Sequence, residues 1–354
     1  MSGHRQGRVA FLLNANAKSV TRKQKRRLSL LIPKEDLYIS HSLDEAQEKI
    51  AEIMSQGYAY LFSGGGDGTA VSTINLLSQY ARIMPEHLIP RMGVLKLGTG
   101  NALARLLGAH EPQRDVRAIM SGKTLKPLMV SMVETNEGIL TPFAGIGYDG
   151  ELINDFEKVK QVFFESPLRK FFSSLVGFII AGLFKTLPRQ AGKNPPTIMV
   201  TSSQPYYRIA FNEGKDEEIY IDEGTTLYKA IAPLICVGTI PSLGYGINMF
   251  PFALKRPGYM HLRISAVPLP TAIANLYPKI WHGTFRHPEL YDFLVKDVTI
   301  ESDASLPYQL AGDAMGYKKK LYFKVSTHPI AMASLGRPPK KGNAASLPLM
   351  TPLG

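Results

Sequence analysis

Short apolar runs alternate with helical patterns along the first third of the chain. Three runs have the length and composition of buried strands: Val9–Leu13, Tyr58–Phe62 and Met92–Leu97. Three segments between or after them have helical spacing: Leu43–Met54, Thr69–Gln79 and the shorter Ala102–Leu107. Strands that alternate with helices build a parallel sheet with helices on both of its faces. We therefore predict a doubly wound α/β domain over residues 8–130.

The pattern changes after about residue 130. Short β-rich segments separated by Gly, Pro and Asp follow one another: Pro195–Val200, Tyr206–Phe211, Glu218–Ile221, Ile231–Val237, Tyr259–Ala266, Val295–Glu301 and Leu321–Ser326. Such spacing indicates an antiparallel β-sandwich or barrel, so we predict a second, β-rich domain over residues 131–332. One long apolar helix candidate, Pro167–Leu187, interrupts it. Residues 333–354 are rich in Pro, Gly, Ala and Lys without periodicity, which predicts a disordered tail.

Composition narrows the class of protein only in part. The chain has 354 residues, a length suited to two domains, and a single cysteine, Cys236, which excludes a disulfide framework. The net charge of +12 favours nucleic acid, nucleotide phosphates or an anionic membrane as partners, and does not choose among them. The apolar run Phe171–Phe184 falls short of the roughly 20 residues that a membrane-spanning helix needs. No signal peptide is visible, so we expect a cytoplasmic protein.

A glycine-rich loop stands between a predicted strand and a predicted helix, in the sequence Ser63-Gly-Gly-Gly-Asp67-Gly68-Thr69. Successive glycines leave backbone N–H groups open, so the loop can wrap around a phosphate, and the helix that follows adds its positive dipole end. Asp67 repels a phosphate by itself, which points to a magnesium ion between the two. A plain tight turn would not need this carboxylate. The loop matches neither GxGxxG nor the Walker A pattern.

A second strand–loop–helix element repeats this architecture at Leu97-Gly98-Thr99-Gly100-Asn101. Two loops at the carboxyl ends of parallel strands converge on one crevice, which is the usual ligand position in open α/β sheets. Together the two loops favour phosphate binding over coincidence.

These two motifs resemble those of the diacylglycerol kinase catalytic family, which includes sphingosine kinases and bacterial lipid kinases. Three further segments extend the resemblance over most of the chain. Asn14 stands in the place of the family's opening Asn-Pro nucleotide loop, and Gly145-Ile-Gly-Tyr-Asp149 matches its Gly-x-Gly-aromatic-Asp segment. Gln309-Leu-Ala-Gly-Asp313 stands where the family has Asp-Gly-Glu.

The resemblance implies an ATP-dependent lipid kinase that phosphorylates a hydroxyl of diacylglycerol or a related lipid alcohol. Asp313 would be the general base, and Asp67 would hold Mg²⁺. The residues expected to bind ATP are Asn14, Gly65, Gly66, Asp67, Gly68, Thr69, Gly98, Thr99 and Asn101, with Ser40 added on a weaker alignment. The apolar segment Pro167–Leu187 lies where relatives have a lipid-facing helix, although a helix packed on the β-rich domain fits its pattern as well.

Three departures from the family pattern bear on the mechanism. Ala311-Gly312-Asp313 keeps one acid, shortened by one methylene, and a shift of about 1 Å in a catalytic group can cost roughly a hundredfold in rate. Ala15 replaces the usual proline, and Lys18 is a candidate to take over a phosphate contact. Pro257-Gly258 stands where some bacterial members have an Asp-Gly pair, so we expect their secondary metal site to be absent.

Other functions stay open at this point. An NAD kinase shares the Gly-Gly-Asp-Gly loop, and the altered motifs also fit a catalytically silent protein that binds nucleotide or lipid. Nucleic-acid binding is disfavoured because no recognition motif accompanies the charge. We expect an anionic membrane surface as a partner and peripheral membrane association. The oligomeric state is not determined by the sequence, and a homodimer is one option.

Overall fold

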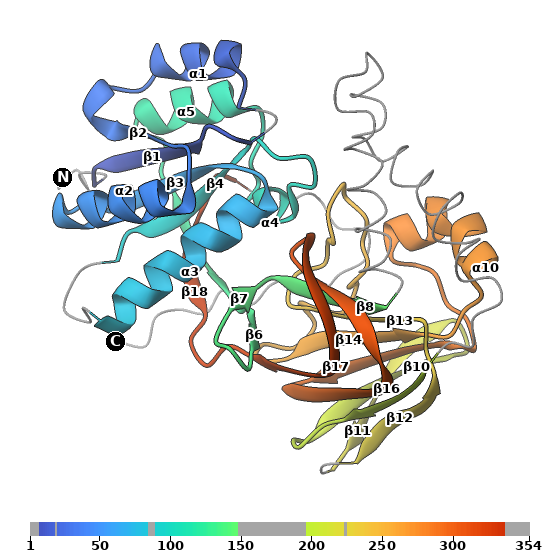
Figure 1. The fold of residues 1–354 in the computed structure, drawn as a ribbon. Helices are drawn as coiled ribbons and strands as arrows, with labels where there is room; N and C mark the ends of the chain where they lie inside the picture. The colour runs from blue at the N-terminus through green and yellow to red at the C-terminus, as the bar shows by residue number, and fades with distance from the viewer. Residues whose placement is uncertain (1–6, 18–19, 84–88, 148–195, 223–224, 337–354) are drawn as a thin grey trace, which may run out of the picture.

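The computed structural model describes residues 7–17, 20–83, 89–147, 196–222 and 225–336, and within them the chain forms two domains side by side (Figure 1). The first domain is an α/β layer structure around one six-stranded sheet. The second is built on a large antiparallel sheet. This arrangement confirms the predicted fold class.

The sheet of the first domain has the order β2-β1-β3-β4-β18-β5. The first five strands are parallel, and β5 runs antiparallel to β18 at the edge. Its strands are β1 (Val9–Asn14), β2 (Leu37–Ser40), β3 (Tyr60–Gly65), β4 (Arg91–Lys96), β5 (Lys126–Val130) and β18 (Ile330–Ser334). Because β1 to β4 are parallel, Asn14, Ser40, Gly65 and the loop after Lys96 all lie at one edge of the sheet, as the sequence predicts.

Helices cover both faces of this sheet (Figure 1). They are α1 (Arg22–Ser29), α2 (Leu43–Ser55), α3 (Asp67–Ile83), α4 (Ala102–Leu106) and α5 (Pro112–Met120), with a short 3₁₀ turn at Lys34–Asp36. α2 begins where the Ser42 hydroxyl accepts a hydrogen bond from the Glu45 N–H, which satisfies a backbone group that a helix start leaves unpaired. The buried residues Ile50, Ile53 and Met54 then form its inward stripe.

The second domain is a twelve-stranded sheet whose described pairings are all antiparallel. Its strands are β6 (Val133–Thr135), β7 (Leu140–Thr141), β8 (Phe143–Gly147), β9 (Thr197–Thr201), β10 (Tyr206–Asn212), β11 (Lys215–Ile221), β12 (Thr226–Ile231), β13 (Leu234–Gly238), β14 (Met260–Ser265), β15 (Leu290–Val295), β16 (Asp297–Leu310) and β17 (Asp313–Val325). A helix, α10 (Leu269–Ala274), and a π turn at Leu276–Ile280 lie at one end.

The last described strand returns to the first domain. After β17 the chain forms β18, which pairs with β4 and β5, and Leu335 behind it is fully buried and donates its N–H to the Leu107 carbonyl at 2.8 Å. The predicted tail therefore began too early, because residues 333–335 are part of the first domain. The sequence pattern of so short a strand cannot be distinguished from that of a loop. The other predicted boundaries stay predictions.

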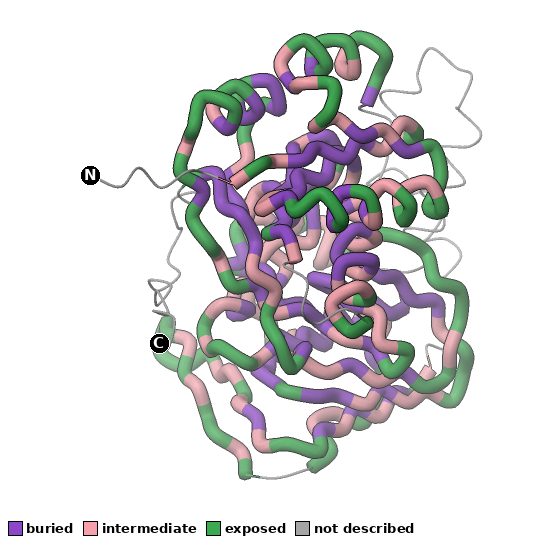
Figure 2. Tube along the Cα trace, turned by 90° about the vertical axis from the view of Figure 1, so that its left-hand side faces the viewer, coloured by how far each residue is buried: buried purple, intermediate pink, exposed green. Residues whose placement is uncertain are grey.

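Buried residues concentrate in the two sheets and in the helix faces that cover them (Figure 2). One polar cluster is also fully buried, on β14 and β15. The Asp292 carboxylate accepts hydrogen bonds from Arg263 Nε at 2.7 Å and Arg263 Nη2 at 3.0 Å, and it lies 2.9 Å from His261 Nε2. Burial lowers the pKa of His261, whereas the charge of Arg263 holds the pKa of Asp292 below its usual range.

Within the part of the chain that the structure describes, no helix is both long and apolar enough to cross a membrane. The candidate helix Pro167–Leu187 lies outside the described residues, as do Lys18, Tyr148 and Asp149.

Candidate active site

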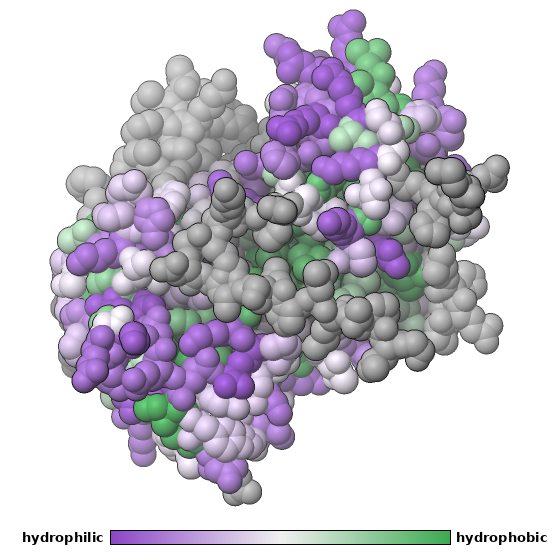
Figure 3. All heavy atoms as spheres, turned by 180° about the vertical axis from the view of Figure 1, so that it is seen from behind, coloured by the Kyte–Doolittle hydropathy of each residue, from purple (hydrophilic) through white to green (hydrophobic). Residues whose placement is uncertain are grey.

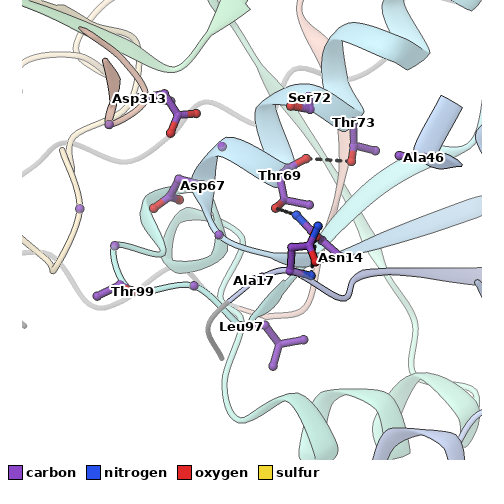
Figure 4. Close-up of a pocket in the computed structure, with 18 of the residues that line it drawn as sticks. Asn14, Ala17, Ala46, Asp67, Thr69, Ser72, Thr73, Leu97, Thr99 and Asp313 are labelled. Atoms are coloured by element: carbon purple, nitrogen blue, oxygen red, sulfur yellow. Dashed lines mark hydrogen bonds between the residues drawn. The ribbon is translucent and has the colours of Figure 1, made fainter. Parts of the chain in front are cut away.

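A cavity of about 660 Å³ lies between the two domains, where the carboxyl ends of β1, β2 and β3 face the turn between β16 and β17 (Figure 4). Most of the predicted site residues line it: Asn14, Ser40, Gly66, Asp67, Gly68, Thr69, Gly98, Thr99 and Asp313. The remaining two, Gly65 and Asn101, belong to the same loops and do not line the cavity. The fold thus brings together residues that are up to about 300 positions apart, while their binding roles stay predictions.

The first glycine loop ends directly in α3, whose first turn faces the cavity (Figure 4). A side chain on Gly65 would collide with Thr69, so only glycine fits the approach of the loop to the helix. Asn14 Nδ2 donates a hydrogen bond to Thr69 Oγ1 at 3.0 Å, which ties the end of β1 to this turn. The open amides of the loop and the helix dipole make this end of α3 attractive to an anion.

The second loop is shaped by Asn101, which has a left-handed backbone with φ of 55°. Its side chain accepts a hydrogen bond from the Gly98 N–H at 2.9 Å and donates one to the Gly98 carbonyl at 2.6 Å. A Cβ at Gly98 would lie 2.7 Å from the Gly66 Cα, so the two loops touch through their glycines. Asn101 was predicted to bind ATP, and in the structure its amide closes the loop that exposes Thr99.

Asp67, in the first loop, forms a hydrogen bond to the helix that follows the second loop. Its Oδ1 accepts a hydrogen bond from the Ala102 N–H at 2.8 Å, at the start of α4. The pKa of Asp67 is raised to about 6: burial is the main cause, backbone amides at the start of α4 oppose the shift by hydrogen bonding, and the charge of Asp313 adds a smaller upward contribution. A carboxyl group with so perturbed a pKa in a cleft is a candidate for a functional role.

Asp313 enters the cavity from the second domain (Figure 4). Ala311 and Gly312 form a two-residue turn with φ of 50° and 91°, which is the left-handed geometry that suits the twist of a tight hairpin. Gly312 donates its N–H to Gln309 Oε1 at 2.7 Å. This turn makes Asp313 the first residue of β17 and brings its Oδ2 to 2.5 Å from where a Cβ on Gly68 would lie.

The acids of the cavity fit a divalent cation held mainly by phosphate oxygens. Asp67 and Asp313 both line the cavity, and no group of three His, Cys, Asp or Glu side chains gathers among the described residues. Mg²⁺ commonly binds through one or two carboxylates plus substrate phosphates and water rather than in an all-protein cage. No Lys or Arg is among the described residues that line the cavity, so a polyphosphate there has no protein cation in this set to balance it.

Tyr245 is a cavity residue that the sequence analysis missed. Its φ is 53°, which is unusual for a bulky residue, and Gly244 and Gly246 on either side also have positive φ. The Tyr245 N–H donates to the Gly100 carbonyl at 2.9 Å, so a loop of the second domain is anchored on the second glycine loop. Burial raises the pKa of its phenol, with a further contribution from Asp67. The Gly-Tyr-Gly triplet was the available signal.

Comparison with known proteins agrees with this arrangement. Residues 8–132 match the family model of the diacylglycerol kinase catalytic domain, which confirms the resemblance seen in the motifs. The fold is similar to the crystal structure of a diacylglycerol kinase from Bacillus anthracis str. Sterne, with a TM-score of 0.56 and 17% identity over 93% of this chain and 97% of that one. A second structure from that organism, of a candidate diacylglycerol kinase, has a TM-score of 0.57 and 17% identity, covering 90% and 94%. Among curated proteins, none matches the chain.

Proposed function

Because residues 8–132 match the catalytic domain of diacylglycerol kinases, we propose that the protein is an ATP-dependent lipid kinase. It transfers the γ-phosphate of ATP to a hydroxyl of diacylglycerol or a related lipid alcohol. The observation that carries this proposal is the position of Asp313. A carboxylate from the second domain stands at the first turn of α3, directly beside the glycine loop that is suited to phosphate.

An apolar part of the cavity wall suits a nucleotide base. Apolar side chains from β1, α2, α3 and β8 line it: Leu12, Leu43, Ala46, Leu76 and Phe143. Hydroxyl groups of Ser40 and Thr73 stand among them. Binding sites for flat ligands are mostly apolar with a few polar groups that fix orientation. A base in this slot would extend its phosphates toward the loop at Gly66–Thr69.

Phosphoryl transfer needs little covalent chemistry from the protein and depends on positioning and charge neutralisation. The amides of the two loops and the Thr69 hydroxyl would bind phosphate oxygens, and the Asp313 carboxylate would accept the proton of the attacking lipid hydroxyl. Mg²⁺ held by Asp67 with phosphate oxygens would neutralise charge on the transferred group. The altered motif Ala311-Gly312-Asp313 supports this role, because the tight turn brings the shorter acid to the phosphate loop.

The test is phosphate transfer from labelled ATP to a mixed lipid extract, with Mg²⁺ present, for the wild type and three variants. We expect wild-type turnover, and a loss of at least a hundredfold in Asp313→Ala and Asp67→Ala. Asp303→Ala removes an exposed carboxylate of the second domain and should retain wild-type turnover. Wild-type activity equal to that of both site variants would favour a silent binding protein. Transfer to NAD and not to lipid would favour an NAD kinase.

A further inference from the structure

The outward face of α1 carries four cations and no acid. Arg22, Lys23, Arg26 and Arg27 are all exposed. At about 100° per residue, these four positions span an arc of about 140° on one side of the helix. Leu28 lies on the opposite side and is fully buried against the first domain. Within the described part of the chain, none of the four cations forms an ion pair.

This face is unfavourable for the helix itself. Like charges stand at i and i+4 in two pairs, Arg22 with Arg26 and Lys23 with Arg27. Opposite charges at this spacing would stabilise the helix. Arg22 and Lys23 also stand in the first turn, at the positive end of the helix dipole, and that turn contains no acid. The dipole favours only Arg26 and Arg27, which stand in the last turn. A face that only needed to be soluble could alternate Glu and Lys. The repulsion between these like charges indicates that an anionic partner outside the chain balances them.

An exposed leucine lies at the centre of the same arc. Leu30 follows α1 with helical backbone angles, is 78% exposed, and projects at about 80° on the scale where the cations span 0° to 140°. The neighbouring helix α5 packs beside α1, with Gln113 Nε2 donating to Gln24 Oε1 at 3.0 Å, and it adds the exposed Arg114 and Arg117. Figure 3 shows hydrophilic side chains gathered over this end of the first domain around an apolar patch.

We propose that this α1 face, the cations of α1 and α5 around Leu30, docks the protein on an anionic lipid bilayer. Cations around a central leucine fit the interfacial zone of a membrane, where the charges meet headgroups and the apolar side chain enters the acyl boundary. A nucleic acid would match the charges and leave Leu30 without a function. The choice of a bilayer rests on the proposed function, because a lipid alcohol resides in a membrane. α1 also begins five residues after Ala17, which lines the cavity.

The test is co-sedimentation of the full chain with vesicles of phosphatidylcholine containing 0% or about 30% phosphatidylserine. Each Lys or Arg near an anionic surface contributes about a fivefold factor in partitioning. The variant with Arg22, Lys23, Arg26 and Arg27 all changed to Gln should therefore bind anionic vesicles at least a hundredfold more weakly. The matched control changes four scattered exposed lysines of the second domain to Gln: Lys215, Lys229, Lys279 and Lys319. This control has the same net charge as the α1 variant and should bind anionic vesicles within a few-fold of the wild type.

Three results would overturn the proposal. One is equal loss in the control, which would make net charge the cause. Another is unchanged binding of Leu30→Ser, where we expect about a tenfold loss. The third is tighter binding of the wild type to duplex DNA than to anionic vesicles.

The α1 variant should keep wild-type turnover on detergent-dispersed diacylglycerol. A wild type that sediments with anionic vesicles and phosphorylates no lipid would refute the proposed function and leave the docking face standing.

Discussion

A methyl group at Gly68 would meet the carboxylate that we propose as the general base. A Cβ at this position lies 2.5 Å from Asp313 Oδ2, 3.3 Å from its Cγ and 3.4 Å from Oδ1. Carbon–oxygen contacts of this kind settle near about 3.3–3.6 Å, so in Gly68→Ala the carboxylate moves by about 1 Å. Such a displacement of a catalytic group costs roughly a hundredfold in rate. We therefore expect kcat to fall by about that factor.

Stability should change in the opposite direction. Gly68 lies in the first turn of α3, and the three atoms nearest to the new methyl all belong to the side-chain carboxylate of Asp313 rather than to backbone. Replacement of a helical glycine by alanine stabilises by up to about 1 kcal/mol. A urea titration should therefore place the unfolding midpoint of Gly68→Ala at or above that of the wild type.

The control is Gly336→Ala, because a Cβ there has no neighbour within 4 Å and the residue lies away from the cavity. It should match the wild type in kcat and in midpoint. Full kcat in Gly68→Ala would show that the position of the Asp313 carboxylate does not limit turnover. A lowered midpoint would show that the clash propagates beyond the carboxylate, and either result refutes the reasoning.

Three further predictions follow from two buried carboxyl groups, those of Asp67 and Asp292. The pKa of Asp67 is raised to about 6, so kcat/KM should fall about tenfold per pH unit below that pKa, as a pH profile from 5 to 8 would show. Since the shift is upward, ionised Asp67 opposes folding at neutral pH, and Asp67→Asn should unfold at a higher temperature at pH 8 while losing turnover. Asp292→Ala leaves Arg263 and His261 unpaired in the core and should destabilise by about 3–5 kcal/mol in urea. The control Glu52→Ala breaks an exposed ion pair with Lys49 and should destabilise by about 1 kcal/mol or less.

Local patterns were sufficient to predict the elements that carry the two loops. Apolar runs of strand length and helical spacing placed β1, β3, β4, α2 and α3 to within a few residues, and glycine chemistry marked the loops between them. Two of the elements that the pattern missed are short or polar: β2 has four residues, and five of the eight residues of α1 are cationic. Neither offers an apolar stripe long enough to show a period, and each is held in place by tertiary packing.

The interior of the site was less predictable, because it depends on backbone geometry. The side chain of Asn101 hydrogen-bonds to the backbone of Gly98, and its left-handed φ is not visible in the sequence. The approach of Tyr245 to Gly100 joins two domains across more than a hundred residues. Sequence distance hides such contacts, and the residue types alone do not distinguish a loop that closes on itself from one that binds a ligand.

The return of the chain through β18 ties together the two domains between which the site is divided. Two connections join the domains, one after β5 and one after β17, and they hydrogen-bond to each other: the Ser326 N–H donates to the Met132 carbonyl at 2.8 Å, and the Met132 N–H donates to Ser326 Oγ at 3.0 Å. Asn75 of α3 adds a second tie, since its side chain bonds both the N–H and the carbonyl of Leu140 at 2.8 Å. α3 is the helix that presents Gly68, and β17 is the strand that presents Asp313. The paired connections fix the position of Asp313 relative to Gly68, so the domain arrangement itself sets the position of the proposed base.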